Sequence, residues 1–456
     1  MLSNSLIDDD RAHLIHPVAP LRAHERRGVT VLQSANGCYL TDASGHTVLD
    51  GFAGLWCVNT GYGHESIVEA AMEQMRRLPY ATGYFHFGSE PAIKLATKIA
   101  QLAPGDLDHV FFTLGGSDAV DTVIRMVRYY NNALGRPHKK HFIGLERGYH
   151  GSSSNGAGLT ALPVFHQGFD LPHAWQHHIP SPYPYRHPAG PNGEAIIAAS
   201  VKSLRDKVAE IGEENVAAFI CEPVQGSGSV IVPPDGFLTA MQDTCRELGI
   251  LFIVDEVITG FGRTGPMFAC EHEGLLPDFM TIAKGLTAGY APMGAAVVSN
   301  RIYQVIADAA PDGTPFGHGL TYSGHPVSAA VGLEVLRLYQ EGGLLENGKR
   351  MGAYFGNRLS ELRDHPLVGD VRSQGLLGAV EIVTNKATRQ KPAKELKLSG
   401  RLFDEGYRNG LIFRAFADDT IGFAPPLCIT QDEIDLLMER LEKTLDTILD
   451  IKELRA

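Results

Sequence analysis

The chain has 456 residues, of which 20% are charged and 44% hydrophobic, as in an ordinary globular protein. Its formal net charge of -12 is spread along the sequence, which argues against nucleic acid and anionic membranes as partners. No stretch approaches the roughly 18 consecutive apolar residues of a membrane span. The length can bury a large core, and we expect two domains.

Cysteine usage and the first residues indicate the compartment. Six cysteines, at positions 38, 57, 221, 245, 270 and 428, lack the close spacing of metal or disulfide frameworks. Residues 1–10 are acidic and lack the basic and apolar regions of a secretion signal. We therefore expect reduced thiols and a cytoplasmic protein.

Two polar clusters suggest surface loops. The histidines of the segment 173–178 lie beside the proline-rich stretch 180–191, which we expect to be a surface excursion, and we predict no metal site there. The basic cluster 136–140 is short and precedes a strand, so it is typical of a solvated loop.

After about forty mixed residues and two short strands, apolar strands alternate with glycine-bearing loops and helices. Strand signals end at Thr113, Leu145, Cys221 and Asp255, and one more precedes Lys284. Continuous apolar strands alternating with helices predict a mostly parallel sheet covered on both faces. Ligands of such sheets bind outside the carboxyl ends of the strands. We expect this large domain to span residues 61–325.

After residue 325 the regular alternation of strands and helices ends. Two helices, to about residues 341 and 364, precede strand segments at 371–383 and 411–423 and a last helix at 430–450. This pattern predicts a smaller α+β domain over residues 326–456, with residues 1–60 as an N-terminal segment that packs against it. One apolar face of the last helix should be core: Ile434, Leu437, Met438, Leu441, Leu445 and Ile448.

Two strand ends carry residues suited to chemistry. Lys284 follows a buried strand, and desolvation there would lower the pKa of its amine and make it a nucleophile. The alternative is a lysine that simply leaves the core where the strand meets water. Asp255 ends a neighbouring apolar strand, so the two side chains can face one pocket.

Two glycine-rich motifs suggest anion binding. Gly115-Gly116-Ser117 joins a strand to a helix, where free amides and a hydroxyl can hold a phosphate, although a serine-capped turn would look the same. Residues 260–265 match GxGxxG, but Pro266 follows at once and no helix pattern begins there. A nicotinamide fingerprint needs that helix, so we disfavour a dehydrogenase.

A lysine amine, a carboxylate and a phosphate cradle together suit pyridoxal 5'-phosphate. Residues 255–265 read Asp-Glu-Val-x-x-Gly-Phe-Gly-Arg-Thr-Gly and Lys284 follows, with further motifs at 54–59, 115–119, 148–151, 222–223 and 319–326. On these motifs the chain resembles the class III aminotransferases, and within them the ω-transaminases that use amines with pyruvate. The resemblance implies an α/β fold-type I pyridoxal-phosphate transferase, with a mostly parallel sheet between helices in a large domain and a smaller α+β domain.

The resemblance also implies roles for the cofactor's neighbours. Lys284 would hold pyridoxal phosphate as a Schiff base and move the substrate proton, and Asp255 would pair with the ring nitrogen. Residues expected around the ring and phosphate are Gly116, Ser117, Tyr149, Glu222 and Val257. Thr321 would reach the phosphate of a neighbouring subunit's cofactor, which implies a homodimer with sites at the interface and leaves a tetramer open.

Further residues resemble a substrate pocket. Trp56, Tyr84, Phe85 and Tyr149 match its aromatic walls. The alternative for each is core packing, which stays open for Trp56 taken alone. Arg414 matches an arginine that binds the keto-acid carboxylate with two parallel hydrogen bonds and swings aside for apolar amines. Two departures from the family pattern stand at the Val120-Asp121 pair and at Ser227, where many relatives have alanine.

The implied reaction is a ping-pong transfer of an amino group from an amine or ω-amino acid to a small keto acid, for which we expect pyruvate. The alternatives within the family are a transaminase specific for β-alanine, taurine or a polyamine, and an aminomutase.

Overall fold

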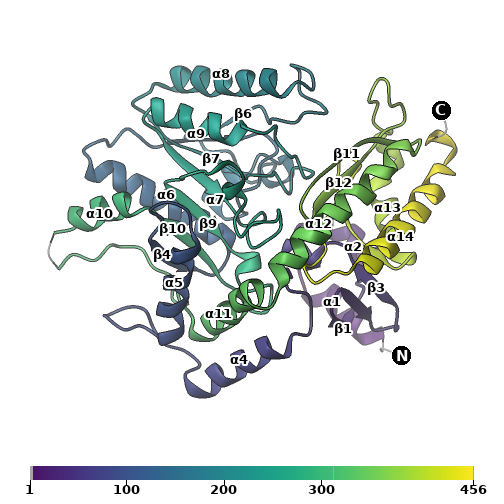
Figure 1. Cartoon of the computed structure of the whole chain (residues 1–456), viewed down its shortest axis with the longest axis horizontal. Coiled ribbons are helices and arrows are strands. Elements are labelled where there is room, and N and C mark those ends of the chain that lie inside the picture. Colours follow the sequence, from purple (N-terminus) through teal and green to yellow (C-terminus); the bar gives the residue numbers. More distant parts are fainter. Residues whose placement is uncertain (1–3, 312, 455–456) are drawn as a thin grey trace.

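The computed structural model describes residues 4–311 and 313–454. Figure 1 shows a larger body built around one sheet and a smaller body that contains both ends of the described chain. In the described ranges, no helix combines the length and the apolar character that crossing a membrane requires.

The larger body is built on a seven-stranded sheet with the order β4-β10-β9-β8-β7-β5-β6. Only β10 runs antiparallel to its neighbours, so the predicted mostly parallel sheet is confirmed. The central strands are buried along their whole length, which explains their continuous apolar sequences. The strands are β4 (His109–Thr113), β5 (His141–Leu145), β6 (Gln176–Ile179), β7 (Val216–Cys221), β8 (Leu251–Asp255), β9 (Phe279–Ile282) and β10 (Gly294–Val298).

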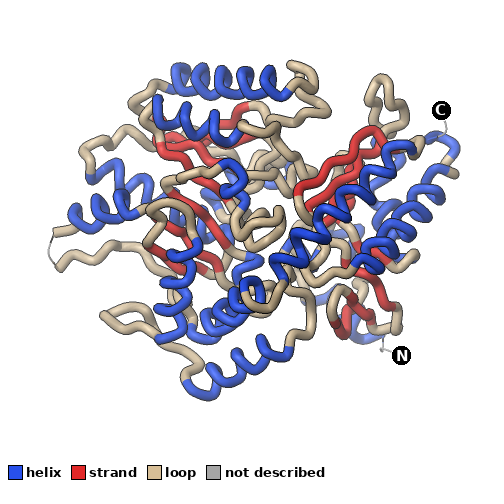
Figure 2. The backbone as a smooth tube through the Cα atoms, in the orientation of Figure 1, coloured by secondary structure: helices blue, strands red, loops and turns tan. Residues whose placement is uncertain are grey.

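Helices cover both faces of this sheet (Figure 2). On one face, Val120, Val123 and Val127 of α6 belong to a cluster with Ala218 and Ile253 of the strands. On the other face, α9 packs on β8 and α8 packs on α9. The helices of this body are α4 (Glu65–Arg77), α5 (Glu90–Leu102), α6 (Gly116–Ala133), α7 (Ser154–Leu159), α8 (Gly193–Ile211), α9 (Phe237–Glu247), α10 (Asn300–Ala309) and α11 (Pro326–Gln340).

The smaller body contains two four-stranded sheets. One has the order β11-β12-β15-β14, from β11 (Val368–Gln374), β12 (Leu377–Ile382), β15 (Thr420–Phe423) and β14 (Arg414–Ala415). The other joins β1 (Leu32–Asn36), β2 (Tyr39–Asp42) and β3 (Thr47–Asp50) to β13 (Leu411–Ile412), so segments from the first and the last fifty or so residues of the chain share a sheet. Its helices are α1 (Asn4–His13), α2 (Leu21–Arg27), α12 (Leu344–Glu361), α13 (Leu398–Arg408) and α14 (Gln431–Leu449).

In the smaller body the structure confirms the predicted helix face and divides the two predicted strand segments into shorter strands. The apolar face expected on the last helix is buried on α14, which confirms it as core. The segment 371–383 is two strands joined by a turn at Gly375, whose φ of 59° lies in the left-handed region that glycine adopts freely. The segment 411–423 is three short strands.

The proline-rich stretch 180–191 is not the surface excursion that its composition predicts. Tyr183 is buried, and its hydroxyl donates to the carboxylate of Glu381 on β12. Arg186 Nε donates to the same carboxylate at 2.6 Å. The prediction is wrong because the partner that makes burial favourable lies almost two hundred residues further along the chain.

The GxGxxG motif joins the two bodies. No α-helix follows residues 260–265, as expected from the prolines. Arg263 is fully buried and its Nη1 donates to the carbonyl oxygens of Ala424 at 2.8 Å and Pro425 at 2.5 Å, just after β15. The motif therefore serves packing between the larger body and β15, and not dinucleotide binding.

Candidate active site

A cavity of about 120 Å³ opens at the carboxyl ends of β7 and β8. Parallel strands place their carboxyl ends at one edge of the sheet, which is where such folds bind ligands. Every residue predicted to bind the cofactor lines this cavity except Thr321. The lining consists of Gly116, Ser117, Tyr149, His150, Gly151, Glu222, Asp255, Val257, Ile258 and Lys284.

Lys284 lies two residues beyond β9, at the start of a 3-10 turn (Lys284–Leu286). Its φ of 38° is in the left-handed region, which costs a residue other than glycine roughly 1–2 kcal/mol. Burial lowers the pKa of its amine, and the nearby carboxylates of Asp255 and Glu222 only partly oppose this effect. The amine is therefore more often neutral at pH 7 than that of an exposed lysine.

Asp255, the last residue of β8, is held by two hydrogen bonds. Its Oδ2 lies 2.8 Å from Nδ1 of the buried His150, and its Oδ1 accepts from the backbone N–H of Val257 at 3.1 Å. The other ring nitrogen of His150, Nε2, is buried without a hydrogen-bond partner in the described part of the chain. These contacts fix the carboxylate at the cavity wall.

His150 is the site residue that the sequence reasoning missed. It stands in the motif 148–151, after β5, next to Tyr149, to which the family resemblance gives a role. The signal was present: a histidine just beyond the carboxyl end of a parallel strand can reach the ends of neighbouring strands.

Glu222 follows β7 and is fully enclosed. Its Oε1 accepts from the N–H of Tyr149 at 2.9 Å, and its Oε2 accepts from the N–H of Gly226 at 3.0 Å. Burial raises its pKa to about 7, so its charge changes near neutral pH. The side chain of Tyr149 is also largely desolvated, and burial raises the pKa of its phenol.

The loop from β4 into α6 forms an anion cradle. The first amides of a helix have no partners in a preceding turn and carry its positive dipole end. A Cβ on Gly116 would lie 2.9 Å from Val257, and one on Gly151 would lie 2.7 Å from Ser117 Oγ, so both positions require glycine. Ser117 Oγ also accepts from the N–H of Ser152 at 3.1 Å.

The departure at Val120-Asp121 has a local explanation. Val120 is buried in the cluster under α6. Asp121 Oδ1 accepts from the N–H of Gly156 at 2.9 Å and from Ser153 Oγ at 2.8 Å, so this residue ties α6 to α7. Neither residue lines the cavity.

Trp56 and Arg414 are linked through one aromatic ring. Trp56 is only 3% exposed and packs between Phe52, at 4.5 Å between ring centroids, and Phe416, at 6.4 Å. Arg414 Cζ lies 5.7 Å from the centroid of the same Phe416 ring. Ile258 joins this apolar cluster to the cavity, because it belongs to both.

Arg414 is exposed as a residue, although partial burial lowers the pKa of its guanidinium, and within the described residues this group has no hydrogen bond or ion pair. Ser227 is partly exposed and adjoins Gly226, whose N–H is bound by Glu222. Neither residue is part of the cavity lining.

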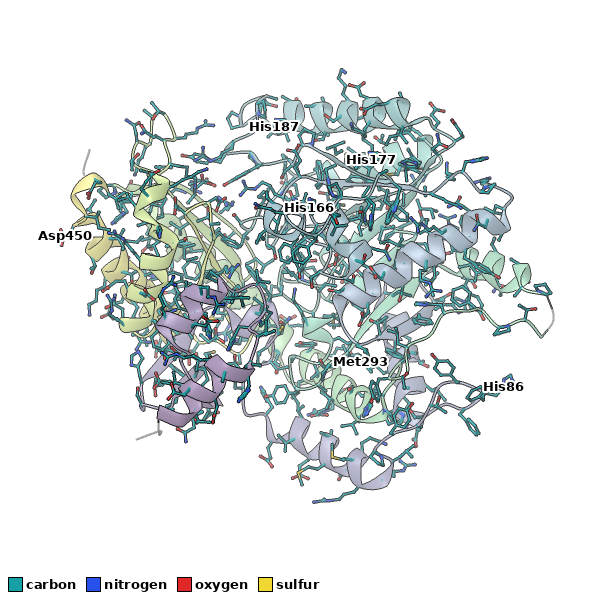
Figure 3. All side chains as sticks on the ribbon, turned by 180° about the vertical axis from the view of Figure 1, so that it is seen from behind. His86, His166, His177, His187, Met293 and Asp450 are labelled. Carbon is teal, nitrogen blue, oxygen red and sulfur yellow. The ribbon has the colours of Figure 1, made fainter. Side chains whose placement is uncertain are left out.

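Tyr84, Phe85 and Thr321 lie together, but apart from this cavity. Tyr84 and Phe85 are 42% and 80% exposed in the loop between α4 and α5, and Figure 3 shows the adjacent His86 at the outer edge of the molecule. Tyr80 Oη donates to the carbonyl of Thr321 at 2.9 Å, which fixes the loop to the segment 319–326. Of the predicted site, the fold brings the cofactor residues together and leaves these three at the surface.

Comparisons with known proteins agree with this geometry. The profile of the family described as aminotransferase class-III matches residues 22–445. The putrescine–pyruvate aminotransferase of Pseudomonas aeruginosa is 44% identical over 96% of this chain and 94% of its own length. The diaminobutyrate–2-oxoglutarate transaminase of Halomonas elongata is 39% identical, over 98% and 96%.

Solved structures are equally similar. A thermostable (S)-enantioselective omega-transaminase from Thermomicrobium roseum superposes with a TM-score of 0.95, at 41% identity, covering 98% of this chain and 99% of that one. The omega transaminase of Pseudomonas jessenii, solved in complex with PMP, gives 0.94 at 37%, covering 97% and 98%.

The chain belongs to the class III aminotransferases. It is a fold-type I enzyme that depends on pyridoxal 5'-phosphate, as predicted. The cavity fits this cofactor: an anion cradle at the start of α6, the fixed carboxylate of Asp255 and the amine of Lys284 all border it. Bound there, pyridoxal phosphate supplies an aldehyde for the substrate amine and an electron-accepting ring.

Proposed function

We propose that this aminotransferase passes an amino group from an amine or ω-amino acid to a small keto acid, and that the keto acid is pyruvate. The observation that carries the proposal is Arg414, a guanidinium with no ion-pair partner in the described residues, placed over Phe416 beside the aromatic cluster. A guanidinium binds a carboxylate with two parallel hydrogen bonds, and the apolar ring beneath it suits an amine without a carboxylate. Pyruvate as acceptor is supported by the name of the 44% identical relative.

The residues around the cavity divide the work. We assign Lys284 to holding the cofactor and to moving the proton at the carbon that bears the amino group, since its amine has a lowered pKa. Asp255, whose orientation is fixed by His150, would pair with the ring nitrogen. Of the other residues that line the cavity, Gly116 and Ser117 would bind the phosphate, and Tyr149 and Val257 would border the two faces of the ring.

The proposal includes a homodimer that works in the cytoplasm. Tyr84, Phe85 and Thr321 form one group at the surface in which all three residues are exposed. A second copy would bury these aromatic side chains and use them, with Thr321, to complete its own site. Trp56, Ser227 and Arg414 complete the substrate side from the same subunit as Lys284.

A polyamine donor is the second candidate. It is supported by the same relative, which is named for putrescine. A panel of amine donors distinguishes a polyamine transaminase from one that prefers other amines. The donors are putrescine, β-alanine, taurine and a primary aryl-alkyl amine, pyruvate is the acceptor, and alanine is the measured product.

The test of the proposal uses Arg414→Ala in the holoenzyme. We expect KM for pyruvate to rise at least tenfold, because a charge-assisted hydrogen-bonded pair contributes about 1.5–3 kcal/mol, while the half-reaction with an aryl-alkyl amine changes little. Arg401→Ala, an exposed arginine on α13, is the control. Unchanged pyruvate kinetics in Arg414→Ala, or turnover in Lys284→Ala, would contradict the assignment.

A further inference from the structure

A second cavity lies at the opposite edge of the seven-stranded sheet from Lys284. Its volume is about 410 Å³, within the range of small-molecule sites. Lys139, Leu251 and Asp278 place it where β5, β8 and β9 begin, so we call it the amino-edge pocket. Its lining is Tyr130, Asn131, Arg136, Lys139, Gln242, Cys245, Arg246, Gly249, Ile250, Leu251, Phe252, Leu276, Asp278 and Arg301.

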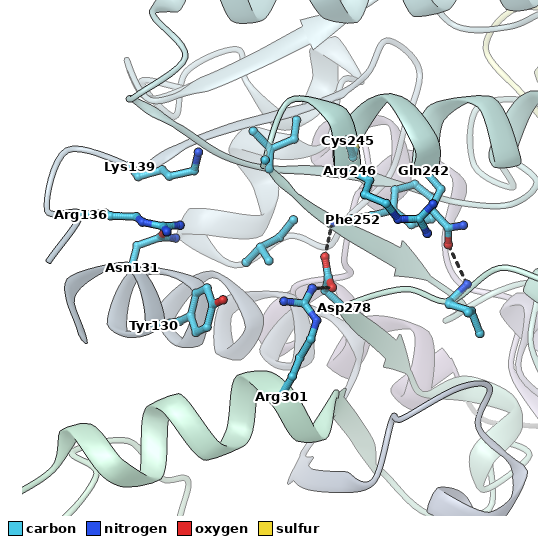
Figure 4. A pocket seen from close by; sticks show the side chains of 14 residues that line it. Tyr130, Asn131, Arg136, Lys139, Gln242, Cys245, Arg246, Phe252, Asp278 and Arg301 are labelled. Atoms are coloured by element: carbon cyan, nitrogen blue, oxygen red, sulfur yellow. Dashed lines mark hydrogen bonds and ion pairs between the residues drawn. The ribbon is translucent and has the colours of Figure 1, made fainter. Parts of the chain in front are cut away.

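Four cationic side chains and one carboxylate line the amino-edge pocket, in a protein whose net charge is -12. The carboxylate, Asp278, is already engaged: it pairs with Arg301 and accepts from the N–H of Phe252 at 2.8 Å (Figure 4). Arg246 pairs with Asp243 at 2.8 Å. The pocket therefore carries a local excess of positive charge.

Arg136 and Lys139 provide this excess. In the part of the chain that the structure describes, neither side chain has an ion pair or a hydrogen bond. Burial, together with repulsion from Arg136, lowers the pKa of Lys139, and the opposing attraction of Glu213 is the weaker effect. An anion between the two cations would remove that repulsion.

Neutral groups complete the amino-edge pocket. Gln242 is buried, and its Oε1 accepts from the N–H of Leu276 at 2.7 Å, which leaves its NH2 group without a partner among the described residues. The exposed Leu276 and the ring of Tyr130 offer apolar contact at the same pocket. Figure 4 shows Arg136 and Lys139 on the side of the pocket away from Gln242.

We propose that the amino-edge pocket binds the phosphate group of a small phosphorylated metabolite. Arg136 and Lys139 bind the phosphate oxygens on one side of the pocket. On the other side the free NH2 group of Gln242 donates to the organic part, which Tyr130 and Leu276 also contact. Arginine and lysine together suit a doubly charged phosphate monoester better than a single carboxylate. The short cluster 136–140, which by its sequence alone is typical of a solvated loop, thus contributes to a site.

The amino-edge pocket and the active-site cavity lie at opposite ends of the same strands. β8 begins at Leu251 in the pocket and ends at Asp255 in the cavity, a span of roughly 13 Å at the usual strand rise. β9 begins next to Asp278 and ends two residues before Lys284. Binding at one edge is therefore structurally separate from the cofactor phosphate at the other.

Isothermal titration of the holoenzyme tests the proposal, because its cofactor site is already filled. The probes are adenosine 5'-monophosphate, inorganic phosphate, adenosine and acetate. We expect the monophosphate to bind most tightly, phosphate more weakly, and adenosine and acetate not at all, with affinity falling as salt rises. Binding of adenosine as tight as that of its monophosphate, or no binding of either phosphate probe, would overturn the proposal.

Paired variants locate the site. Arg136→Ala/Lys139→Ala should weaken monophosphate binding at least tenfold, and Arg136→Glu should weaken it further. Arg76→Ala/Lys443→Ala, which removes two exposed cations elsewhere, is the matched control and should bind like the parent protein. Since all four side chains lie at the surface or partly so, thermal unfolding should be unchanged. Equal affinity in the pocket variant and the control would show that the phosphate binds elsewhere.

Discussion

At the scale of single residues, the active site depends on groups that the fold withdraws from water. Lys284 and Asp255 were predictable, because a charged residue at the end of an apolar strand stands out in the sequence. The position of His150 beyond a strand end was a signal too, but its contact with Asp255, 105 positions away, could not be predicted from the sequence. For Trp56 the sequence allows either core packing or a place in the pocket wall, and the structure has features of both. Trp56 is buried, and through Phe416 it belongs to the apolar cluster that borders the cavity.

Glu222 gives a prediction about pH and stability. Burial raises its pKa to about 7, above the ordinary 4.5, so the folded apoprotein binds a proton that the unfolded chain releases. This contribution to stability is complete below pH 4.5 and is lost as the pH rises to 7, amounting to about 3 kcal/mol.

The measurement is denaturant unfolding of the apoprotein between pH 5 and 8, compared with Glu222→Gln. The variant should be less stable overall, because an amide cannot accept from the N–H groups of both Tyr149 and Gly226. Its stability should nevertheless fall less steeply with pH than that of the parent. Parallel pH curves would contradict the raised pKa.

At the scale of elements, the turn between β14 and β15 is fastened to the larger body. Asp418 in this turn pairs with Arg147, and Ser229 Oγ donates to both of its oxygens at 2.9 and 3.0 Å. Arg147 Nε also donates to the carbonyl of Gly228 at 3.2 Å. These bonds hold the hairpin that carries Arg414 against the segment that carries Ser227.

Asp418→Asn should therefore loosen Arg414 without touching the cofactor residues. We expect KM for pyruvate to rise several-fold to about tenfold, as the loss of one charge-assisted pair implies, with kcat nearly unchanged. Asp419→Asn is the control, because that carboxylate faces Ser399 on α13 instead. An equal effect of both substitutions would indicate general loss of stability of the turn.

Element positions in the larger body were also well predicted, and those in the smaller body less so. Buried parallel strands such as β7 and β8 are uniform apolar runs between turn signals, so their ends are clear. The strands β13 and β14 have two residues each, which is too short for any period to appear. The burial of Tyr183 depends on the distant Glu381, which no local pattern contains.

At the scale of the whole molecule, the exposed group of Tyr84, Phe85 and Thr321 predicts shared active sites. Mixing subunits that carry Lys284→Ala with subunits that carry Thr321→Ala should give more activity than either variant has by itself. Random reassociation makes half of the dimers mixed, and each has one native site, so about a quarter of the parent activity should return.

The control mixes each variant with itself, and co-purification through an affinity tag carried by only one of the two variants confirms that subunits have exchanged. If exchanged mixtures are no more active than the average of the two variants, each chain builds its active site alone.

The expected division into residues 1–60, 61–325 and 326–456 is a separate prediction, which limited proteolysis can check.

The parallel pairing of β3 with β13 has a consequence for synthesis. Leu49 and Leu411 are partners although 362 positions (411 - 49) separate them. The first three strands therefore emerge from the ribosome long before the strand that completes their sheet, and closing so long a loop is slow. Until then β3 presents an unpaired edge, on which nascent chains of this protein are vulnerable to mispairing with one another. Chains truncated before residue 411 should consequently aggregate through this edge.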